Sequence, residues 1–182
     1  MDEKVIKSIN EARWADGQTV WNRLEDITFN PMQSQEEFVM RLIRENAKTA
    51  FGRNHGFEFI RSMEEYRQRI HVTTYEDYIQ YIERIVNGER NVLTAYLTEH
   101  LSLHHGYKVL PQSRWGVQLY NDYNFCAMFY IAGNHGLLTD GMVLNLVDNH
   151  LEQLPSGVCK GNLLGRLLIR REFDHNQLYV IP

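Results

Sequence analysis

Repeated helix start and stop signals in residues 20–90 constrain the fold of this chain most. A hydroxyl residue followed three positions later by an acidic one can satisfy the free N–H groups at a helix N-terminus. This capping-box pattern occurs at Ser34 and Glu37, at Ser62 and Glu65, and at Thr73 and Glu76. Stop signals stand at Asn30–Pro31, Gly52 and Asn87–Gly88. We therefore expect the first half of the chain to be helical.

The second half of the chain alternates short strand-like runs with helices. Strands are expected at residues 91–97, 101–103, 107–110, 142–147 and 179–181. Ser113 is expected to cap a long helix that ends at a turn over residues 133–136, and residues 163–168 indicate another helix. Strands separated by helices favour an α/β fold, a layered sheet with flanking helices and some parallel pairing. We take residues 1–182 as a single truncated domain, helical over about 1–90 and α/β over about 91–182.

Charge and hydropathy narrow the classes of partner. A net charge of -4 and a pI of about 6.1 give no electrostatic basis for binding nucleic acid. The longest apolar run, residues 125–138, is interrupted at residues 133–136, so we expect no membrane helix. The charged first residues do not form a secretory signal, and we expect a reduced cytoplasmic protein. Cys126 and Cys159 are then expected to be buried small residues rather than nucleophiles.

Four segments of the first half occur in an order and spacing typical of one enzyme family. They are residues 47–57 (AKTAFGRNHGF), 64–69 (EEYRQR), 73–78 (TTYEDY) and 81–89 (YIERIVNGE). Three later segments keep the same order: residues 119–123 (LYNDY), 141–146 (GMVLNL) and 154–157 (LPSG). From about Val20 onward the chain thus resembles the N-terminal region of the auxin-responsive (GH-three) acyl-acid amido synthetases.

The resemblance implies both a fold and a chemistry. The fold it implies is the N-terminal part of the large domain of adenylate-forming enzymes. Enzymes of this family use ATP and magnesium to activate a carboxylic acid as an acyl-adenylate. They then transfer the acyl group to an amine, commonly an amino acid. The family's Ser-Ser-Gly-Thr-Thr-type loop is the part that holds the ATP phosphates, through backbone N–H groups and hydroxyls.

This chain departs from the family at that loop. Gly106 matches the loop glycine and Lys108 matches a lysine that follows it, but only Tyr107 separates them. His104 and His105 stand where the family has paired serines, and the threonines have no counterpart. A connection this short cannot wrap a triphosphate, because one residue spans only about 3.3 to 3.6 Å. We expect a degenerate ATP loop, no catalytic residues, and no cofactor bound by the chain alone.

Other unusual residues have a plain interpretation beside a functional one. His100, His104 and His105 suggest a zinc site, but a strand would space them too widely, so we expect no metal. An aromatic series is expected either to pack in the core or to line an acyl pocket: Tyr120, Tyr123, Phe125, Phe129 and Tyr130. Four residues match strongly patterned family positions, although helix and capping roles would explain them: Tyr75, Glu76, Tyr78 and Arg84.

These observations lead to three functional hypotheses. The first is a non-catalytic, synthetase-like protein, a pseudoenzyme or protein-binding module. Unpaired strand edges and exposed apolar faces would drive it to form a homodimer or to dock on a larger partner. The second is one part of a split ATP-dependent amido synthetase whose other part is a separate polypeptide. The third is a small-molecule binder that keeps a pocket for a carboxylic acid without the chemistry.

Overall fold

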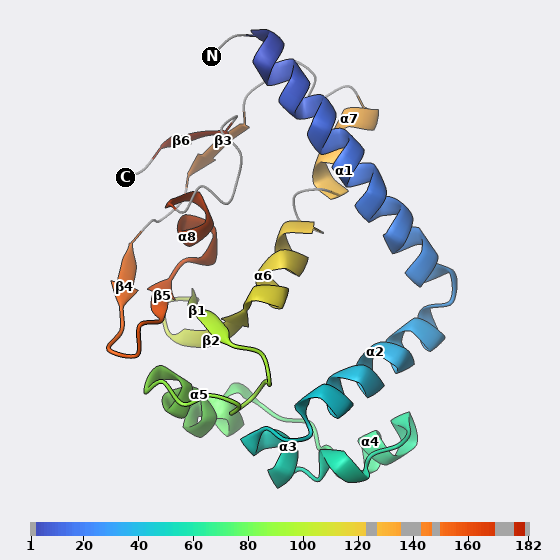
Figure 1. Cartoon of the computed structure of the whole chain (residues 1–182), viewed down its shortest axis with the longest axis vertical. Coiled ribbons are helices and arrows are strands. Elements are labelled where there is room, and N and C mark those ends of the chain that lie inside the picture. Colours follow the sequence, from blue (N-terminus) through green and yellow to red (C-terminus); the bar gives the residue numbers. More distant parts are fainter. Residues whose placement is uncertain (1–2, 123–126, 136–142, 147–149, 170–176, 181–182) are drawn as a thin grey trace. The chain divides into compact units, whose positions relative to one another are not determined.

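The computed structural model describes residues 3–122, 127–135, 143–146, 150–169 and 177–180 (Figure 1). The chain divides into two compact units, which we describe separately. Unit 1 consists of residues 1–29, 115–151 and 162–182. Unit 2 consists of residues 30–114 and 152–161. In the described part of the chain no helix combines the length and apolar character needed to cross a membrane.

Unit 1 contains a long first helix and several short elements. Its helices are α1 (Glu3–Phe29), α6 (Arg114–Asn121), α7 (Ala127–Asn134) and α8 (Leu163–Ile169), and its strands are β3 (Val143–Leu146) and β6 (Gln177–Val180). The two strands pair in parallel, with Val143 opposite Gln177. Helix α1 packs along α7, as Figure 1 shows. The rings of Trp14 and Trp21 stack on Tyr130 at 5.7 and 5.8 Å between centroids.

The long helix expected from Ser113 onward is described as two helices, α6 and α7. Ser113 directly precedes α6, and α7 ends at Asn134, within the turn predicted over residues 133–136. Tyr130 is half-buried and stacks on the two tryptophan rings of α1. Tyr123 and Phe125 lie outside the described residues, as does Cys126. The expected strands at 142–147 and 179–181 correspond to β3 and β6 in the described residues.

Unit 2 begins with a series of helices. They are α2 (Pro31–Asn46), α3 (Ala50–Asn54), η1 (Phe57–Phe59), α4 (Met63–Arg69), η2 (Tyr75–Tyr78) and α5 (Ile79–Val86). The start predicted at Ser34 was wrong. Helix α2 begins at Pro31, whose fixed φ angle and missing N–H suit the first position of a helix. The start predicted at Ser62 is confirmed, because its side chain accepts a hydrogen bond from the Glu65 N–H at 3.2 Å.

The third predicted capping box was displaced by one residue. Thr74 and Asp77 form the box, and the Thr74 N–H donates to Asp77 Oδ2 at 2.7 Å. The stop predicted at Gly52 was also wrong, because this residue lies inside α3. Helix α5 ends at Val86, directly before the predicted stop at Asn87–Gly88.

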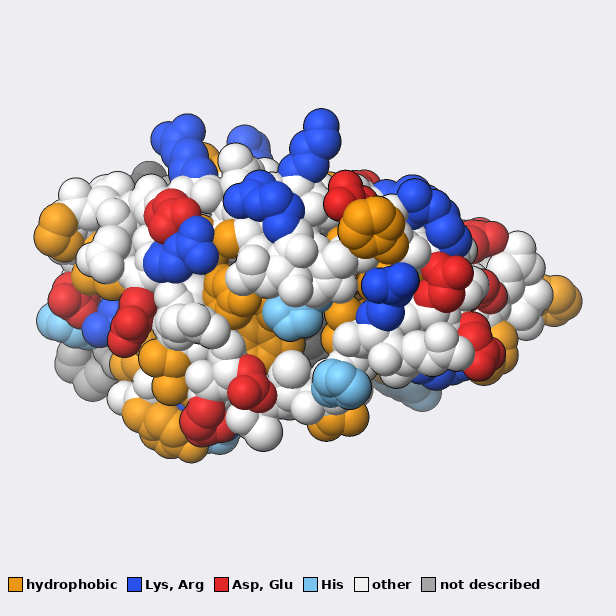
Figure 2. Space-filling view, turned by 90° about the horizontal axis from the view of Figure 1, so that it is seen from below, with side chains coloured by type: hydrophobic (Ala, Val, Ile, Leu, Met, Phe, Trp, Pro, Cys, Tyr) orange, Lys and Arg blue, Asp and Glu red, His pale blue; other side chains and the backbone are white. Residues whose placement is uncertain are grey.

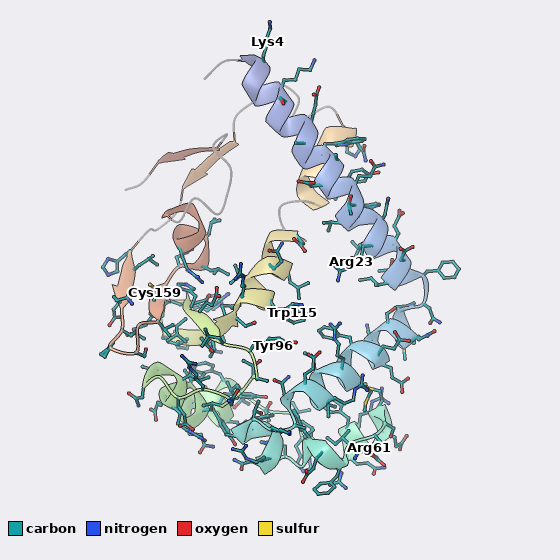
Figure 3. All side chains as sticks on the ribbon, viewed as in Figure 1. Lys4, Arg23, Arg61, Tyr96, Trp115 and Cys159 are labelled. Atoms are coloured by element: carbon teal, nitrogen blue, oxygen red, sulfur yellow. The ribbon has the colours of Figure 1, made fainter. Side chains whose placement is uncertain are left out.

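The main sheet contains four strands in the order β2-β1-β5-β4. Their bounds are β1 (Thr98–His104), β2 (Lys108–Ser113), β4 (Leu151–Gln153) and β5 (Cys159–Gly161). Strand β1 pairs antiparallel with β2 and parallel with β5, so the expected α/β fold with some parallel pairing is confirmed. Cys159, labelled on β5 in Figure 3, is half-buried rather than fully buried. Its thiol donates to Gln153 Oε1 at 3.1 Å.

Two apolar clusters hold unit 2 together. The first joins the sheet to α3 and α5 and is made of Ala50, Tyr81, Ile85, Val92, Leu101 and Leu154. The second joins α2 to the segment after α3 and is made of Met40, Ile43 and Ile60. Leu101 lies at the centre of the sheet and is fully buried. The core of unit 2 therefore lies between the sheet and its helices.

The strand expected at residues 91–97 does not form, because the N-terminus of α3 takes its backbone groups. The N–H groups of Ala50 and Phe51 donate to the carbonyls of Asn91 and Val92 at 2.8 and 2.9 Å. The N–H of Ala95 donates to the buried side chain of Asn46 at 2.8 Å. The backbone groups of residues 91–95 therefore bind α3 and the end of α2 instead of a neighbouring strand. The three segments meet at one corner of unit 2.

Candidate functional site

The segment expected to match the family's phosphate-binding loop is a tight hairpin turn in this chain. His104 pairs with Lys108 across the hairpin, and only His105, Gly106 and Tyr107 connect them. The N–H of Tyr107 donates to the carbonyl of His104 at 3.2 Å. His105 and Gly106 have φ angles of 50° and 77°, the left-handed pair that tight hairpin turns require. The backbone of the turn is therefore used to reverse the chain direction.

The two histidines lie side by side at the tip of this turn. Both side chains are exposed, and their ring centroids are 5.5 Å apart. His100 lies four positions earlier on β1, fully buried, with its Nε2 3.1 Å from the carbonyl oxygen of Gly161. The structure thus separates His100 from the other two. Among the described residues no group of three His, Cys, Asp or Glu side chains is placed to hold a metal ion.

The ammonium group of Lys108 lies close to two aromatic rings. Its Nζ lies 5.4 Å from the centroid of Tyr75 and 5.7 Å from that of Tyr107. A cation over an aromatic face is attracted by the negative charge density of the ring. The position of Lys108, the lysine expected to match the family's, is therefore stabilised by contacts with Tyr75 and Tyr107.

A carboxylate also lies near Lys108. Hydrogen bonds from the Thr74 side chain and from its own backbone N–H, together with the charge of Lys108, hold the pKa of Glu76 below its ordinary value. The ionised form of this carboxyl group is thereby favoured beside the lysine. A phosphate group approaching Lys108 would meet this negative charge as well. This arrangement of charges suits a lysine that stabilises the fold better than a lysine that binds phosphate.

Tyr75 has a role that the sequence did not reveal. Its hydroxyl accepts a hydrogen bond of 2.9 Å from the N–H of Val109 on β2, which is an outer strand of the sheet. Pro111 stands two residues later on the same strand and has no N–H at all. The backbone N–H positions of alternate residues in a strand point to the same neighbouring strand. The N–H of Val109 and the ring nitrogen of Pro111 therefore both face away from β1. The outer edge of β2 is thus closed to a further strand at these two positions.

Replacing Tyr75 by phenylalanine is expected to destabilise the protein by about 1 kcal/mol, because the Val109 N–H loses its partner. Urea unfolding followed by circular dichroism would measure the change. Tyr107→Phe is the matched control, because Tyr107 is 68% exposed and its hydroxyl has no partner among the described residues. Equal stability of the two variants would contradict the role given to the Tyr75 hydroxyl.

Comparisons with known proteins agree with this architecture. A model of the GH3 family N-terminal domain matches residues 20–104, which confirms the resemblance over that range. AtGH3.15 acyl acid amido synthetase in complex with 2,4-DB superposes with a TM-score of 0.76 at 19% identity, over 90% of this chain. A second structure, GH3.15 acyl acid amido synthetase, gives a TM-score of 0.73 at 21% identity, over 86% of this chain.

The two structures share the fold of this chain, but they are much longer. The matched region covers 30% of the first and 29% of the second. No curated protein matched this chain. The predicted fold, that of the N-terminal part of the family's large domain, is therefore confirmed.

Proposed function

Starting from the match of residues 20–104 to the GH3 N-terminal domain, we propose that this chain is a non-catalytic, synthetase-like protein that works by binding. It would be a pseudoenzyme or protein-binding module with no ATP-dependent activity of its own. One observation carries the proposal. The residues expected at the family's phosphate-binding position, His104, His105, Gly106 and Tyr107, form a closed hairpin turn.

Phosphate binding by backbone requires several N–H groups that point at one anion. In this turn the Tyr107 N–H already donates to the His104 carbonyl, and the family's hydroxyl side chains are replaced by exposed imidazoles. Lys108 lies against two tyrosine rings and near the ionised Glu76. Each of these features opposes a triphosphate at this position.

Calorimetric titration of the full chain with ATP and magnesium tests the proposal. We expect that neither the wild type nor Lys108→Ala shows binding heat at millimolar ATP. Micromolar binding by the wild type that is weakened in Lys108→Ala would overturn the proposal. That result would instead support the alternative function, one part of a split ATP-dependent amido synthetase that conjugates a carboxylic acid to an amine.

We propose further that the chain binds a protein partner, either a second copy of itself or a larger protein. Large apolar side chains of unit 2 support this, with exposures of 70% for Met32, 59% for Phe59 and 101% for Val72. Exposed apolar groups favour association because removing apolar surface from water lowers the free energy. Light scattering over a range of concentrations is expected to show a dimer for the self-association case. A monomer at every concentration that also binds no protein in the cell extract would count against association.

A further inference from the structure

We infer that a cavity of unit 2 at the start of β1 binds a single phosphate group. The cavity has a volume of about 330 Å³, at the lower end of the range for small-molecule sites. One wall is formed by residues 88–98, and the other includes Ser156 and Val158 from the turn between β4 and β5. The two walls meet at Gly88, where an added Cβ would lie 3.2 Å from the Cβ of Ser156.

Two backbone N–H groups of the first wall are directed away from α3. The carbonyls of Asn91 and Val92 accept hydrogen bonds of 2.8 and 2.9 Å from the first two N–H groups of α3. A trans peptide is planar and holds its C=O and N–H on opposite sides, so the N–H groups of Val92 and Leu93 point away from that helix. Neither N–H makes a hydrogen bond to any other described residue. Successive N–H groups directed to one side form a concavity that binds anions.

Two side chains of the same wall are also donors. Arg90 is exposed, and within the described part of the chain its guanidinium makes no hydrogen bond or ion pair. The Thr94 hydroxyl accepts the Tyr96 N–H at 3.1 Å, which leaves its own proton to donate. Arginine binds phosphate through parallel, charge-assisted N–H donors. This wall therefore offers donors of three kinds to an anion.

The opposite wall contains a hydroxyl group that the fold leaves unsatisfied. Ser156 Oγ is buried and has no hydrogen-bond partner among the residues that the structure describes. Buried polar atoms without a partner are uncommon in folded proteins and can mark the place of a bound water or ion. A change of χ1 rotamer moves this oxygen, so an acceptor in the cavity can take up its hydrogen bond.

The charges at the cavity leave one cation for a ligand. Figure 2 shows Lys and Arg side chains beside Asp and Glu side chains on the face viewed from below, so an exposed cation alone does not mark an anion site. Glu89 also lines the cavity, but Arg84 binds its carboxylate through two hydrogen bonds of 2.7 and 2.5 Å. The charge of Glu89 is thus balanced within the protein, and the charge of Arg90 remains.

A tetrahedral oxoanion fits these donors better than a carboxylate does. The donors lie on both walls, and a phosphate group presents oxygens in several directions, whereas the two oxygens of a carboxylate lie in one plane. One arginine does not balance the several charges of a triphosphate, so we do not expect ATP to bind here.

The cavity is also separate from the His104–Lys108 turn. It reaches Thr98, the first residue of β1, whereas the turn follows His104, the last residue of that strand. A strand rises about 3.3 Å per residue, which places the two ends of β1 about 20 Å apart. The inference therefore does not depend on what the turn binds.

Titration of the full chain with inorganic phosphate at constant ionic strength, followed by the backbone amide signal of Leu93, tests the inference. We expect a saturable downfield shift of this signal. Arg90→Gln should weaken phosphate binding at least about tenfold, because it removes a charge-assisted hydrogen bond. Arg67→Gln is the matched control, since Arg67 is also exposed but lies on α4 and does not line the cavity, and it should bind as the wild type does.

Ser156→Ala separates binding from folding. Removing an unpaired hydroxyl should leave the urea midpoint of the phosphate-free protein unchanged or higher, while phosphate binding becomes weaker. A lower midpoint together with unchanged phosphate binding would contradict the role given to this hydroxyl at the site.

Four outcomes would overturn the inference. They are no saturable shift with phosphate, equal phosphate binding by Arg90→Gln and Arg67→Gln, acetate binding as tight as phosphate binding, and phosphate binding that is lost in Lys108→Ala but not in Arg90→Gln. The last result would place the anion at the hairpin turn.

Glycerol phosphate identifies the source of the phosphate group. Tighter binding of this ester than of inorganic phosphate would assign the cavity to a phosphate monoester, and the reverse order would assign it to the free ion. The calorimetric ATP titration is judged on Lys108→Ala and the phosphate titration on Arg90→Gln, so the two proposals can fail separately.

Discussion

Replacing Gly52 by alanine is expected to destabilise unit 2 by about 3 kcal/mol or more. A Cβ at this position would lie 2.1 Å from the backbone oxygen of Asn46 and 3.1 Å from the backbone carbon of Ala47. Both obstacles are main chain, so no side-chain rotation can relieve the overlap. They also belong to the corner where α2, α3 and residues 91–95 meet, which would have to shift as a whole.

Urea unfolding of Gly52→Ala would measure this loss. Gly106→Ala is the matched control, because a Cβ at Gly106 would meet no atom within 4 Å. Its cost is limited to the left-handed backbone conformation, about 1 kcal/mol. A Gly52→Ala variant as stable as Gly106→Ala would show that the corner is looser than the structure indicates.

Replacing Thr49 by valine is expected to cost about 2 kcal/mol, although the two side chains have nearly the same shape. Thr49 is completely buried. Its hydroxyl donates to the Asn46 carbonyl at 2.8 Å and accepts the Gly52 N–H at 2.9 Å. Valine would leave the Gly52 N–H buried without a partner, which costs about 1 to 3 kcal/mol, whereas the Asn46 carbonyl would keep its hydrogen bond from the backbone N–H of Thr49 at 3.0 Å.

Thr49→Ser separates the hydroxyl from the methyl group. Serine keeps both hydrogen bonds and loses one buried methyl, which costs about 1 kcal/mol. Chemical denaturation of the two variants should therefore place serine closer to the wild type than valine. The reverse order would mean that packing, and not hydrogen bonding, makes Thr49 necessary.

The sequence predicted the helical first half and the α/β second half because apolar spacing and turn residues are local signals. Its errors lie where a distant or competing partner decides. Ser34 carries a capping pattern, but Pro31 starts the helix earlier. Residues 91–97 have strand-like composition, but the start of α3 and the Asn46 side chain take up their backbone groups. Neither partner of that segment can be recognised from its own residues.

The candidate site divides in the same way. The shortness of the connection between Gly106 and Lys108 can be counted in the sequence, and the structure shows it as a tight turn. The setting of Lys108 could not be predicted, because Tyr75 lies on a different element, 34 residues before Val109.

The closed edge of β2 bears on how this protein behaves when it is concentrated. Amyloid fibrils lengthen when each new strand finds a row of free N–H and C=O groups on the last one. On β2 one outward N–H is bound to the Tyr75 hydroxyl, and the next such position is Pro111. Unit 2 thus resists fibril growth from this side of its sheet, and Tyr75 contributes to colloidal stability as well as to folding.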